Sequence, residues 1–571
     1  MKKIIGVGEV DFAELILNHR YYIDKTRFIK PLFYAAKVCL VTRPRRFGKT
    51  LTLSMIKTFL EMNYRDPSDK TRLHKIFSGL DVYADEAFCQ ENMGEWPVIS
   101  LSFKSIEGRN FEEAFDELKS IIADEADRFS FLEESARLSD RQRVALKKLC
   151  KVDGLEDKES ALLLLADSLR VLEECLYAHF GKNPILLIDE YDVPLQKARI
   201  GGYYDDMLSI IGRMFRKGLK DTRAKAFLTG CLRLAKESVF TGTNNFLAFG
   251  IDNPNFNDAI GFTAEEARNV LSYYNLQEYA DEVRANYDGY RFAGVEIYCP
   301  WDLLCFCQET QFKGIVRFGN YWINSSSNDL ILEFVDYADE EHLGMLSKLM
   351  AGKTVTARID PNLSFAELNV QHSPEQLMSL LYSTGYLTEV DAAPDGRSIL
   401  RIPNKEIDEC FREKINSYFS SRNPSTVERV KLLLNGLNDG AASLVQSSIN
   451  FCLQRFMSVR DGSSEAFYHG FLLSLVGIVG SEYGKRGVAS NRETGDGYSD
   501  IRIDDYEAST RVILELKKCG PGESLEAACD KAIEQIRDRG YGLEDDATLR
   551  TIRLYGIAFR GKHCVVKLMQ P

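Results

Sequence analysis

Residues 38–56 read VCLVTRPRRFGKTLTLSMI and place a strand, a basic loop and a helix in succession. The apolar run over residues 38–42 predicts a buried strand, and the leucine and methionine spacing that follows predicts an amphipathic helix. Gly48, Lys49 and Thr50 lie between the two, where a phosphate-binding loop belongs. There, backbone N–H groups and the lysine bind phosphate, and the threonine hydroxyl reaches Mg²⁺.

This loop departs from the full pattern G-x-x-x-x-G-K-[ST], because Arg43 occupies the position of the first glycine. The loop also holds Arg45 and Arg46, an unusual concentration of positive charge. Taken alone, the segment leaves two interpretations open: a nucleotide site, or a basic helix start that binds no ligand.

Three further apolar runs, at residues 96–103, 184–192 and 225–233, predict strands of the same sheet. Long amphipathic helices separate them, such as the one expected at residues 161–180. Continuous apolar strands between helices indicate a parallel sheet that is covered on both faces.

The second and third of these runs end in polar residues that suit nucleotide chemistry. Asp189 is placed to position Mg²⁺ through water, and Glu190 to orient an attacking water. Buried acids without such a purpose would be costly. Thr229 ends the next strand and would sense a γ-phosphate, whereas Arg233 either stabilises transition-state charge or is a plain surface residue.

Together the loop, the acidic strand and the polar strand predict ATP binding with Mg²⁺. Glu190 is the predicted catalytic residue, and Thr50 and Asp189 are the predicted metal contacts. The predicted nucleotide contacts are Arg45, Arg46, Phe47, Gly48, Lys49, Thr50, Leu51, Asp189, Thr229 and Arg233.

A second candidate site lies in residues 499–520, SDIRIDDYEASTRVILELKKCG. Side chains alternate faces along a strand, so Glu515 and Lys517 share one face, and Asp500 opens the preceding alternating run. Charged residues on a half-exposed edge strand are one explanation. The other is a metal site, in which two carboxylates hold Mg²⁺ or Mn²⁺ and the lysine stabilises negative charge during phosphodiester hydrolysis.

Neighbouring helices add candidates to this second site. Glu465 on the preceding helix would complete a metal-binding cup with Asp500 and Glu515, and Gln535 lies on the following helix. His469 and Tyr541 are expected to be structural residues. Basic residues that either guide a nucleic-acid backbone or form a solvated face are Lys485, Arg486, Arg492 and Lys518.

Composition limits the class of protein. The 571 residues are 45% hydrophobic, and the formal net charge of −12 excludes a uniformly basic nucleic-acid coat. The 13 cysteines form no paired C-x-x-C, which argues against a zinc site and indicates a reducing compartment. Charged residues stand too early for a signal peptide and apolar runs are too short for a bilayer, so we expect a cytoplasmic protein without membrane contact.

The chain resembles the bacterial family that joins an AAA-ATPase-like N-terminal domain to a C-terminal PD-(D/E)xK nuclease-superfamily domain. The matching stretches run nearly end to end and include RPRRFGKTL, LLIDEYDVPL, NYDGYRF, CPWDLL, SNRETGDGYSDI and ILELK. Arginine at the first P-loop position is typical of the family, so the resemblance favours a nucleotide site. Tyr498 stands where relatives usually carry arginine, which removes one contact to a DNA backbone but leaves the metal site.

The resemblance implies that Lys49 and Thr50 are the phosphate and magnesium contacts and that Asp189 and Glu190 are the Walker B pair. It also implies that Asp500, Glu515 and Lys517 are the nuclease triad.

We therefore expect an α/β protein in three parts. Residues 1–264 would form an AAA-like P-loop NTPase domain with a parallel sheet, residues 265–435 a helical linking region, and residues 436–571 a restriction-endonuclease-like α/β domain. The expected function is metal-dependent hydrolysis of DNA that ATP regulates. Domain analogy suggests a role in defence against foreign DNA. A homo-oligomer is the expected assembly. The alternative is a nucleotide-sensing switch or scaffold whose nuclease-like domain does not cleave.

Overall fold

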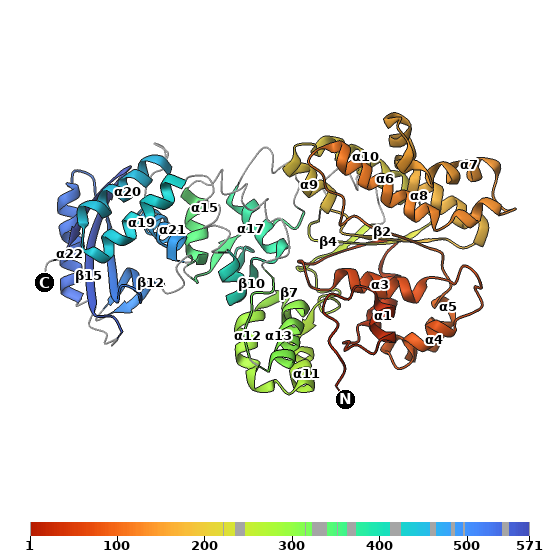
Figure 1. Cartoon of the computed structure of the whole chain (residues 1–571), viewed down its shortest axis with the longest axis horizontal. Helices are drawn as coiled ribbons and strands as arrows, with labels where there is room; N and C mark the ends of the chain where they lie inside the picture. Colours follow the sequence, from red (N-terminus) through yellow and green to blue (C-terminus); the bar gives the residue numbers. More distant parts are fainter. Residues whose placement is uncertain are drawn as a thin grey trace.

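The structure is a computed structural model of the chain, and Figure 1 shows three bodies in a row. They are an N-terminal body (residues 2–261), a middle region (residues 262–411) and a C-terminal body (residues 424–569). The described residues are 2–220, 222–233, 246–314, 316–322, 340–350, 352–362, 373–411, 424–456, 464–480, 486–494, 497–539 and 548–569.

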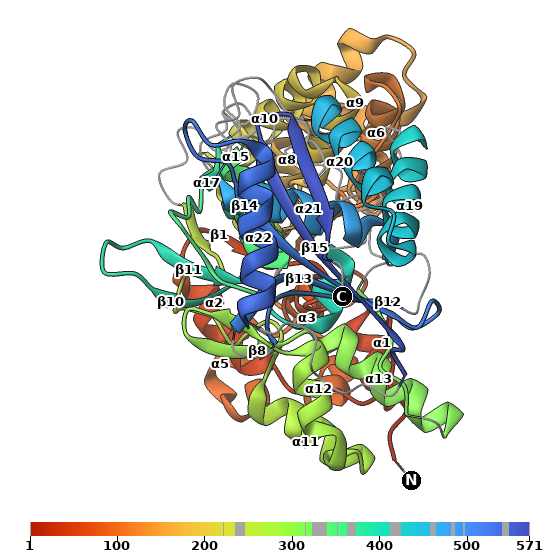
Figure 2. The ribbon, with the colours of Figure 1, turned by 90° about the vertical axis from the view of Figure 1, so that its left-hand side faces the viewer.

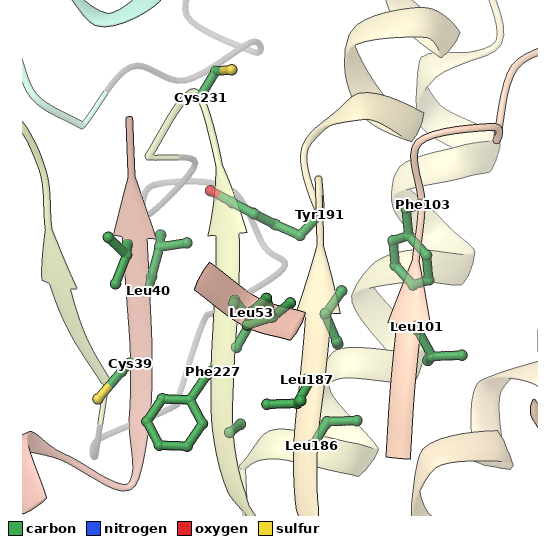
Figure 3. Packing of buried hydrophobic residues seen from close by; sticks show 14 of the residues in the cluster. Cys39, Leu40, Leu53, Leu101, Phe103, Leu186, Leu187, Tyr191, Phe227 and Cys231 are labelled. Atoms are coloured by element: carbon green, nitrogen blue, oxygen red, sulfur yellow. The ribbon is translucent and has the colours of Figure 1, made fainter. Parts of the chain in front are cut away.

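The N-terminal body is built on a parallel sheet with the strand order β2-β3-β4-β1-β5. The expected parallel sheet is thus confirmed, and the strand that leads into the P-loop lies inside it. Apolar side chains of neighbouring strands, such as Leu40, Phe227, Leu187 and Leu101, form the core (Figure 3). The strands are β1 (Val38–Thr42), β2 (Val98–Ser102), β3 (Ile185–Asp189), β4 (Lys225–Gly230) and β5 (Phe246–Phe249).

Helices cover both faces of this sheet, as the continuous apolar strands require (Figure 1). One face carries α6 (Phe111–Asp127), α8 (Lys158–Phe180) and α10 (Tyr204–Leu219). The other carries α1, α3, α4 and α5, at Phe12–Leu17, Lys49–Leu60, Thr71–Phe77 and Glu86–Asn92. Further helices are α2 (Ile29–Ala35), α7 (Asp140–Leu149) and α9 (Val193–Gly201).

The middle region combines helices with two small antiparallel sheets, so it is less purely helical than expected. Its sheets have the orders β6-β8-β7 and β10-β11-β9. The helices are α11 (Ala264–Tyr274), α12 (Ala280–Tyr287), α13 (Pro300–Lys313), α15 (Glu340–Met350) and α17 (Pro374–Thr384). The strands are β6 (Phe262–Thr263), β7 (Tyr290–Phe292), β8 (Val295–Tyr298), β9 (Val355–Ala357), β10 (Thr388–Ala392) and β11 (Ser398–Arg401).

The C-terminal body is a mixed sheet with the order β12-β13-β14-β15-β16, in which only β14 and β15 are parallel. Helix α22 lies across one face, as Figure 2 shows, and three helices pack on the other. The strands are β12 (Arg486–Thr494), β13 (Gly497–Asp505), β14 (Thr510–Lys518), β15 (Thr551–Arg560) and β16 (His563–Leu568). The helices are α19 (Pro424–Asp439), α20 (Ala442–Phe456), α21 (Glu465–Gly480) and α22 (Leu525–Arg539).

Four features of this body differ from the sequence-based expectation. Strand β14 is central, which removes the edge-strand explanation for Glu515 and Lys517. Residues 486–494, expected to be turns, form the edge strand β12, and the single strand expected at the C-terminus is the hairpin β15–β16, which turns at Gly561 with φ of 53°. Helix α19 packs with the C-terminal core, although the boundary expected at residue 436 falls inside it.

No helix within the described ranges combines the length and the apolar character needed to cross a bilayer.

Glu173 of α8 is a buried acid in the N-terminal core. One carboxylate oxygen accepts a hydrogen bond from the Thr222 hydroxyl, and the other has no partner among the described residues. Burial raises the pKa of Glu173 to about 8. The folded protein therefore keeps the proton of Glu173 at pH values where the unfolded chain has released it.

This pKa predicts that Glu173→Gln stabilises the protein in a pH-dependent way. Between about pH 5 and pH 8 the unfolded chain binds fewer protons at residue 173 than the folded protein, so wild-type stability falls with rising pH. The advantage of the variant should grow by ~2–4 kcal/mol over that range and level off above it. Thermal unfolding of both proteins across the range measures it, and a constant difference would contradict the assignment.

Candidate functional site

The P-loop turns sharply between β1 and α3. Arg46 and Gly48 both have left-handed backbones, with φ of 67° and 100°. A Cβ on Gly48 would meet no atom within 4 Å, so this glycine is required by its φ rather than by close packing. Successive turns of this kind direct backbone N–H groups toward one point, which suits an anion at the start of α3.

Lys49 lies in the centre of the nucleotide site and is 4% exposed. Its Nζ donates to the carbonyl oxygens of Arg43 and Pro44 at 3.2 Å and lies 3.4 Å from Oε1 of Glu190. Burial opposes its charge, but Cys231 and the acids Glu190 and Asp189 raise the pKa of Lys49 above its usual value. The site therefore holds a permanent positive charge at the mouth of the loop.

The carboxylate of Asp189 is hydrogen-bonded to two other predicted site residues, Thr50 and Thr229. The Thr50 hydroxyl donates to its Oδ2 at 2.6 Å, and the Thr229 hydroxyl donates to its Oδ1. Burial, and then Glu190, raises the pKa of Asp189. Because Thr50 opens α3 and Asp189 ends β3, an ion between them would take one oxygen from each, which fits Mg²⁺.

Glu190 has features of a functional residue. Its backbone is left-handed, with φ of 52°, which is unusual for a residue with a side chain. Its Oε2 is buried and lacks a hydrogen-bond partner within the described part of the chain. An unpartnered carboxylate oxygen beside Lys49 is available to a water molecule, which agrees with the role predicted for Glu190.

Asp192 is a site residue that the sequence analysis missed. It is fully buried, and its Oδ2 accepts the backbone N–H groups of Cys231 and Leu232 at 3.0 and 2.9 Å. Tyr191 adds a hydrogen bond from its hydroxyl to the carbonyl of Leu232, and Figure 3 shows its ring reaching from the end of β3 toward β4. The signal was present in the sequence DEYD, where this third acid follows the strand.

Arg43, which occupies the glycine position of the motif, is a structural residue. Its guanidinium is fully buried and donates to the carbonyl oxygens of Thr42 and Phe249 at 2.8 and 3.0 Å, and to that of Phe256. It also lies 5.3 Å from the ring of Phe292. These bonds fix the start of the loop to β5 and the segment after it, so Arg43 is not directed at a phosphate.

The other predicted loop residues divide into two groups. Arg45 lies near Cys231 and Glu190, on the acidic side of the site. The Phe47 ring is buried against Tyr290, and Leu51 packs on the core, so only their backbones face a nucleotide.

Two of the predicted arginines contact other parts of the chain. Arg46 lies over the ring of Trp301 at 4.6 Å. Arg233 is paired with Asp252 at 2.7 Å and would have to leave this partner to reach a phosphate.

The second site centres on Glu515, in the middle of the C-terminal sheet. Ile501 pairs with Leu514, so the register places Asp500 opposite Glu515 and on the same face, as expected. Lys517 Nζ lies 3.4 Å from Oε1 of Glu515. The structure thus brings the predicted triad together.

Burial makes this acid pair unusual. Glu515 is 1% exposed, and its Oε2 has no hydrogen-bond partner among the residues described. Burial, with the neighbouring Asp500, raises the pKa of Glu515 to about 7. Asp500 accepts the Leu516 N–H at 2.8 Å, and burial raises its pKa as well. A buried and a half-buried carboxyl group with a free oxygen fit a divalent cation, which would neutralise both.

Glu465 contacts the end of β14. Its Oε2 accepts the backbone N–H of Lys518 at 3.1 Å, and its Oε1 lies 4.0 Å from Lys517 Nζ. Across the described ranges, no three His, Cys, Asp or Glu side chains are grouped so that they could hold one metal ion. Glu465 is close enough to act on Asp500, and its part in the metal-binding cup stays a prediction.

His469 has the structural role expected of it. Its Nε2 lies 2.8 Å from the carbonyl oxygen of Asp500 and donates to it, which fixes α21 against β13. Gln535 is half-buried on α22. Tyr541, Lys485 and the side chains of Tyr498, Arg486 and Arg492 lie outside the described residues.

Comparison with known proteins finds two domain families in the chain. Residues 6–240 match the family model described as predicted AAA-ATPase, and residues 463–568 match that of the PD-(D/E)XK nuclease superfamily. The chain thus carries an AAA-ATPase-like domain followed by a nuclease-superfamily domain, and the resemblance drawn from the sequence is confirmed.

Two individual proteins are similar over long stretches. An uncharacterized protein in the vnfD 5′ region of Azotobacter chroococcum mcd 1 is 24% identical over 579 residues, which cover 98% of this chain and 96% of that protein. The Walker-type ATPase PABY2304 of Pyrococcus abyssi, a solved structure, is 15% identical, with a TM-score of 0.37 over 72% of this chain and 98% of that one.

The contacts of Arg43 predict that restoring the motif glycine is harmful. Arg43→Gly leaves the carbonyl oxygens of Phe249 and Phe256 without this donor and opens a cavity, so it should lower the free energy of unfolding by ~3 kcal/mol or more. Arg43→Lys, which keeps the charge but not the planar fork, should be intermediate. Calorimetry of the three proteins checks this order, and a glycine variant as stable as wild type would contradict it.

The burial of Glu515 predicts a stability gain when its charge is removed. In metal-free buffer near pH 8, Glu515→Gln should be more stable than wild type by ~1–2 kcal/mol, because the carboxylate lies beside Asp500 with a free oxygen. Mn²⁺ or Mg²⁺ should stabilise wild type and have less effect on the variant. Glu526→Gln, an exposed acid on α22, is the matched control, and equal metal responses in all three proteins would refute a metal site at Glu515.

Proposed function

We propose that this chain binds ATP at its P-loop and uses the state of that site to control metal-dependent hydrolysis of DNA by its C-terminal domain. The observation that carries the proposal is Glu515, a buried carboxylate with a free oxygen opposite Asp500 and beside Lys517. Such an arrangement costs stability unless it binds a cation and substrate. A role in defence against foreign DNA follows by domain analogy alone.

In the nuclease-like domain, each residue has a distinct part. Asp500 and Glu515 would hold Mg²⁺ or Mn²⁺, which when bound polarises a phosphate and lowers the pKa of its water. Lys517, held by Glu515 and a quarter exposed, places its ammonium group where charge develops on the phosphate. The Leu516 N–H fixes the carboxylate of Asp500, and His469 fixes its backbone carbonyl.

In the ATPase-like domain, Lys49 and the backbone of residues 45–50 bind phosphate. Thr50 and Asp189 would hold Mg²⁺, and Glu190 accepts a hydrogen bond from the attacking water through its free oxygen. Thr229, bonded to Asp189, transmits a change at the metal to β4.

One observation favours a second function, a nucleotide-sensing switch that binds nucleic acid or a partner without cutting. Among the described residues, no third His, Cys, Asp or Glu side chain is grouped with Asp500 and Glu515 so that the three could hold a metal ion. A binding role requires ATP to change affinity or assembly, with no product formed.

Cleavage of plasmid and linear single-stranded DNA with Mg²⁺ or Mn²⁺, with and without ATP, separates the two functions. Wild type should cut, and Lys517→Ala should lose ~10²-fold or more of the rate because it removes charge stabilisation in the transition state. Lys49→Ala should retain the metal site and lose the response to ATP.

Metal-dependent cutting that persists unchanged in Lys517→Ala would exclude the triad as the source. Absence of cutting by wild type, together with ATP-dependent retention of the same DNA in a binding assay, would establish the switch instead.

A further inference from the structure

The middle region encloses the P-loop from outside the sheet. A Cβ placed on Gly385, at the end of α17, would lie 2.8 Å from Cβ of Pro44, so the backbone of Gly385 lies close against the Pro44 ring. Phe47 packs against Tyr290 and Phe292, with ring centroids 5.0 and 5.2 Å apart. The loop that would bind the nucleotide is therefore held at two points by residues more than 200 positions later in the chain.

Arg46 is the charged contact between the same two parts. Its carbonyl oxygen accepts the Cys299 thiol at 3.6 Å, and its guanidinium lies 4.6 Å from the Trp301 ring. Such a cation–π contact is worth ~0.5–2 kcal/mol. The side chain of a P-loop residue thus lies on the first turn of α13 in the middle region.

A buried acid pair lies next to this contact. Asp302, beside Trp301 in sequence, is 1% exposed, and its carboxyl group interacts with the side chains of Cys299 and Glu406. Glu406 is 2% exposed; one oxygen accepts the backbone N–H of Trp322, and its other oxygen lacks a hydrogen-bond partner among the described residues. Two interacting buried carboxyl groups are rare and require an explanation.

Arg46 supplies the positive charge that faces this pair. Burial raises the pKa of Asp302 to about 7, and burial together with Asp302 raises the pKa of Glu406 to about 9. Arg46 acts on both carboxyl groups in the opposite direction, because its charge favours their ionised forms. The pair and the arginine therefore attract one another.

We propose that Arg46 has two competing partners, the Trp301–Asp302–Glu406 cluster of the middle region and the phosphate groups of a nucleoside triphosphate in the loop. A triphosphate offers a stronger anion to the guanidinium than two protonating carboxyl groups do. Nucleotide binding then weakens the hold of Arg46 on α13, and by linkage the cluster lowers nucleotide affinity by the same factor. The middle region thereby detects nucleotide, and this inference rests on the proposed ATP site.

The test is ATP affinity and Trp301 fluorescence in the full-length chain. In a Trp96→Phe, Trp322→Phe background, Trp301 is the sole tryptophan reporter. Saturating Mg-ATP should change its emission, because the guanidinium leaves the ring, and Arg46→Gln should abolish that change. Asp302→Asn, which is nearly isosteric, should tighten ATP binding about 3–10-fold, and Trp301→Leu should act in the same direction.

The matched control is Glu265→Gln, an exposed acid in the first turn of α11, which should leave the affinity unchanged. ATP affinity within twofold of wild type in both Asp302→Asn and Trp301→Leu would overturn the competition, as would weaker binding in both.

Lys49→Ala separates this failure from that of the proposed function. Binding by wild type that Lys49→Ala removes establishes the ATP site, so a null result at Asp302 then counts against the competition alone. No ATP binding by wild type would overturn both.

Discussion

The carboxylate of Asp189 is the point on which the arrangement around the P-loop depends. It accepts the hydroxyl groups of Thr50 and Thr229, so a single side chain joins the end of β3, the end of β4 and the first turn of α3. The strand order makes this possible, because β4 lies between β3 and the strand that leads into the P-loop. Asp192, three residues after Asp189, makes a similar link: its carboxylate accepts backbone N–H groups of the segment that follows β4. The position of each acid is thus fixed by hydrogen bonds that cross strands.

The sequence was sufficient for what periodicity and strand order control. Continuous apolar runs predicted β1 to β4, and alternation along β14 predicted that Glu515 and Lys517 share a face, with Asp500 on the neighbouring strand. The sequence did not predict strands that are formed by backbone pairing without a clear side-chain pattern. Strand β12 is rich in residues typical of turns, and β5 is only four residues long. Helix spacing likewise does not show that the carboxylate of Glu465 accepts the backbone N–H at the end of β14.

The sequence also did not predict the directions in which the side chains of the P-loop point. Arg43, Arg45 and Arg46 are close in sequence, and all three were taken as one basic patch. In the structure they diverge: Arg43 enters the core, Arg45 faces the acids of the site and Arg46 lies on α13. No local pattern encodes these directions, since each depends on residues that join the loop from other parts of the chain. The same holds for α15, which packs against α21 and so connects the middle region to the helix that fixes Asp500.

The buried guanidinium of Arg43 also has a consequence for the order in which the chain folds. Its carbonyl partners at Phe249 and Phe256 are 206 and 213 residues further along the chain. Contacts over such separations form late, because the entropy of closing the loop must be met first. During synthesis β1 to β4 can assemble while the P-loop still lacks the bonds that shape it. A nascent chain that ends before Phe256 therefore lacks one or both of these carbonyl partners of Arg43, and the P-loop can reach the shape described here only after the fifth strand and the segment beyond it have emerged.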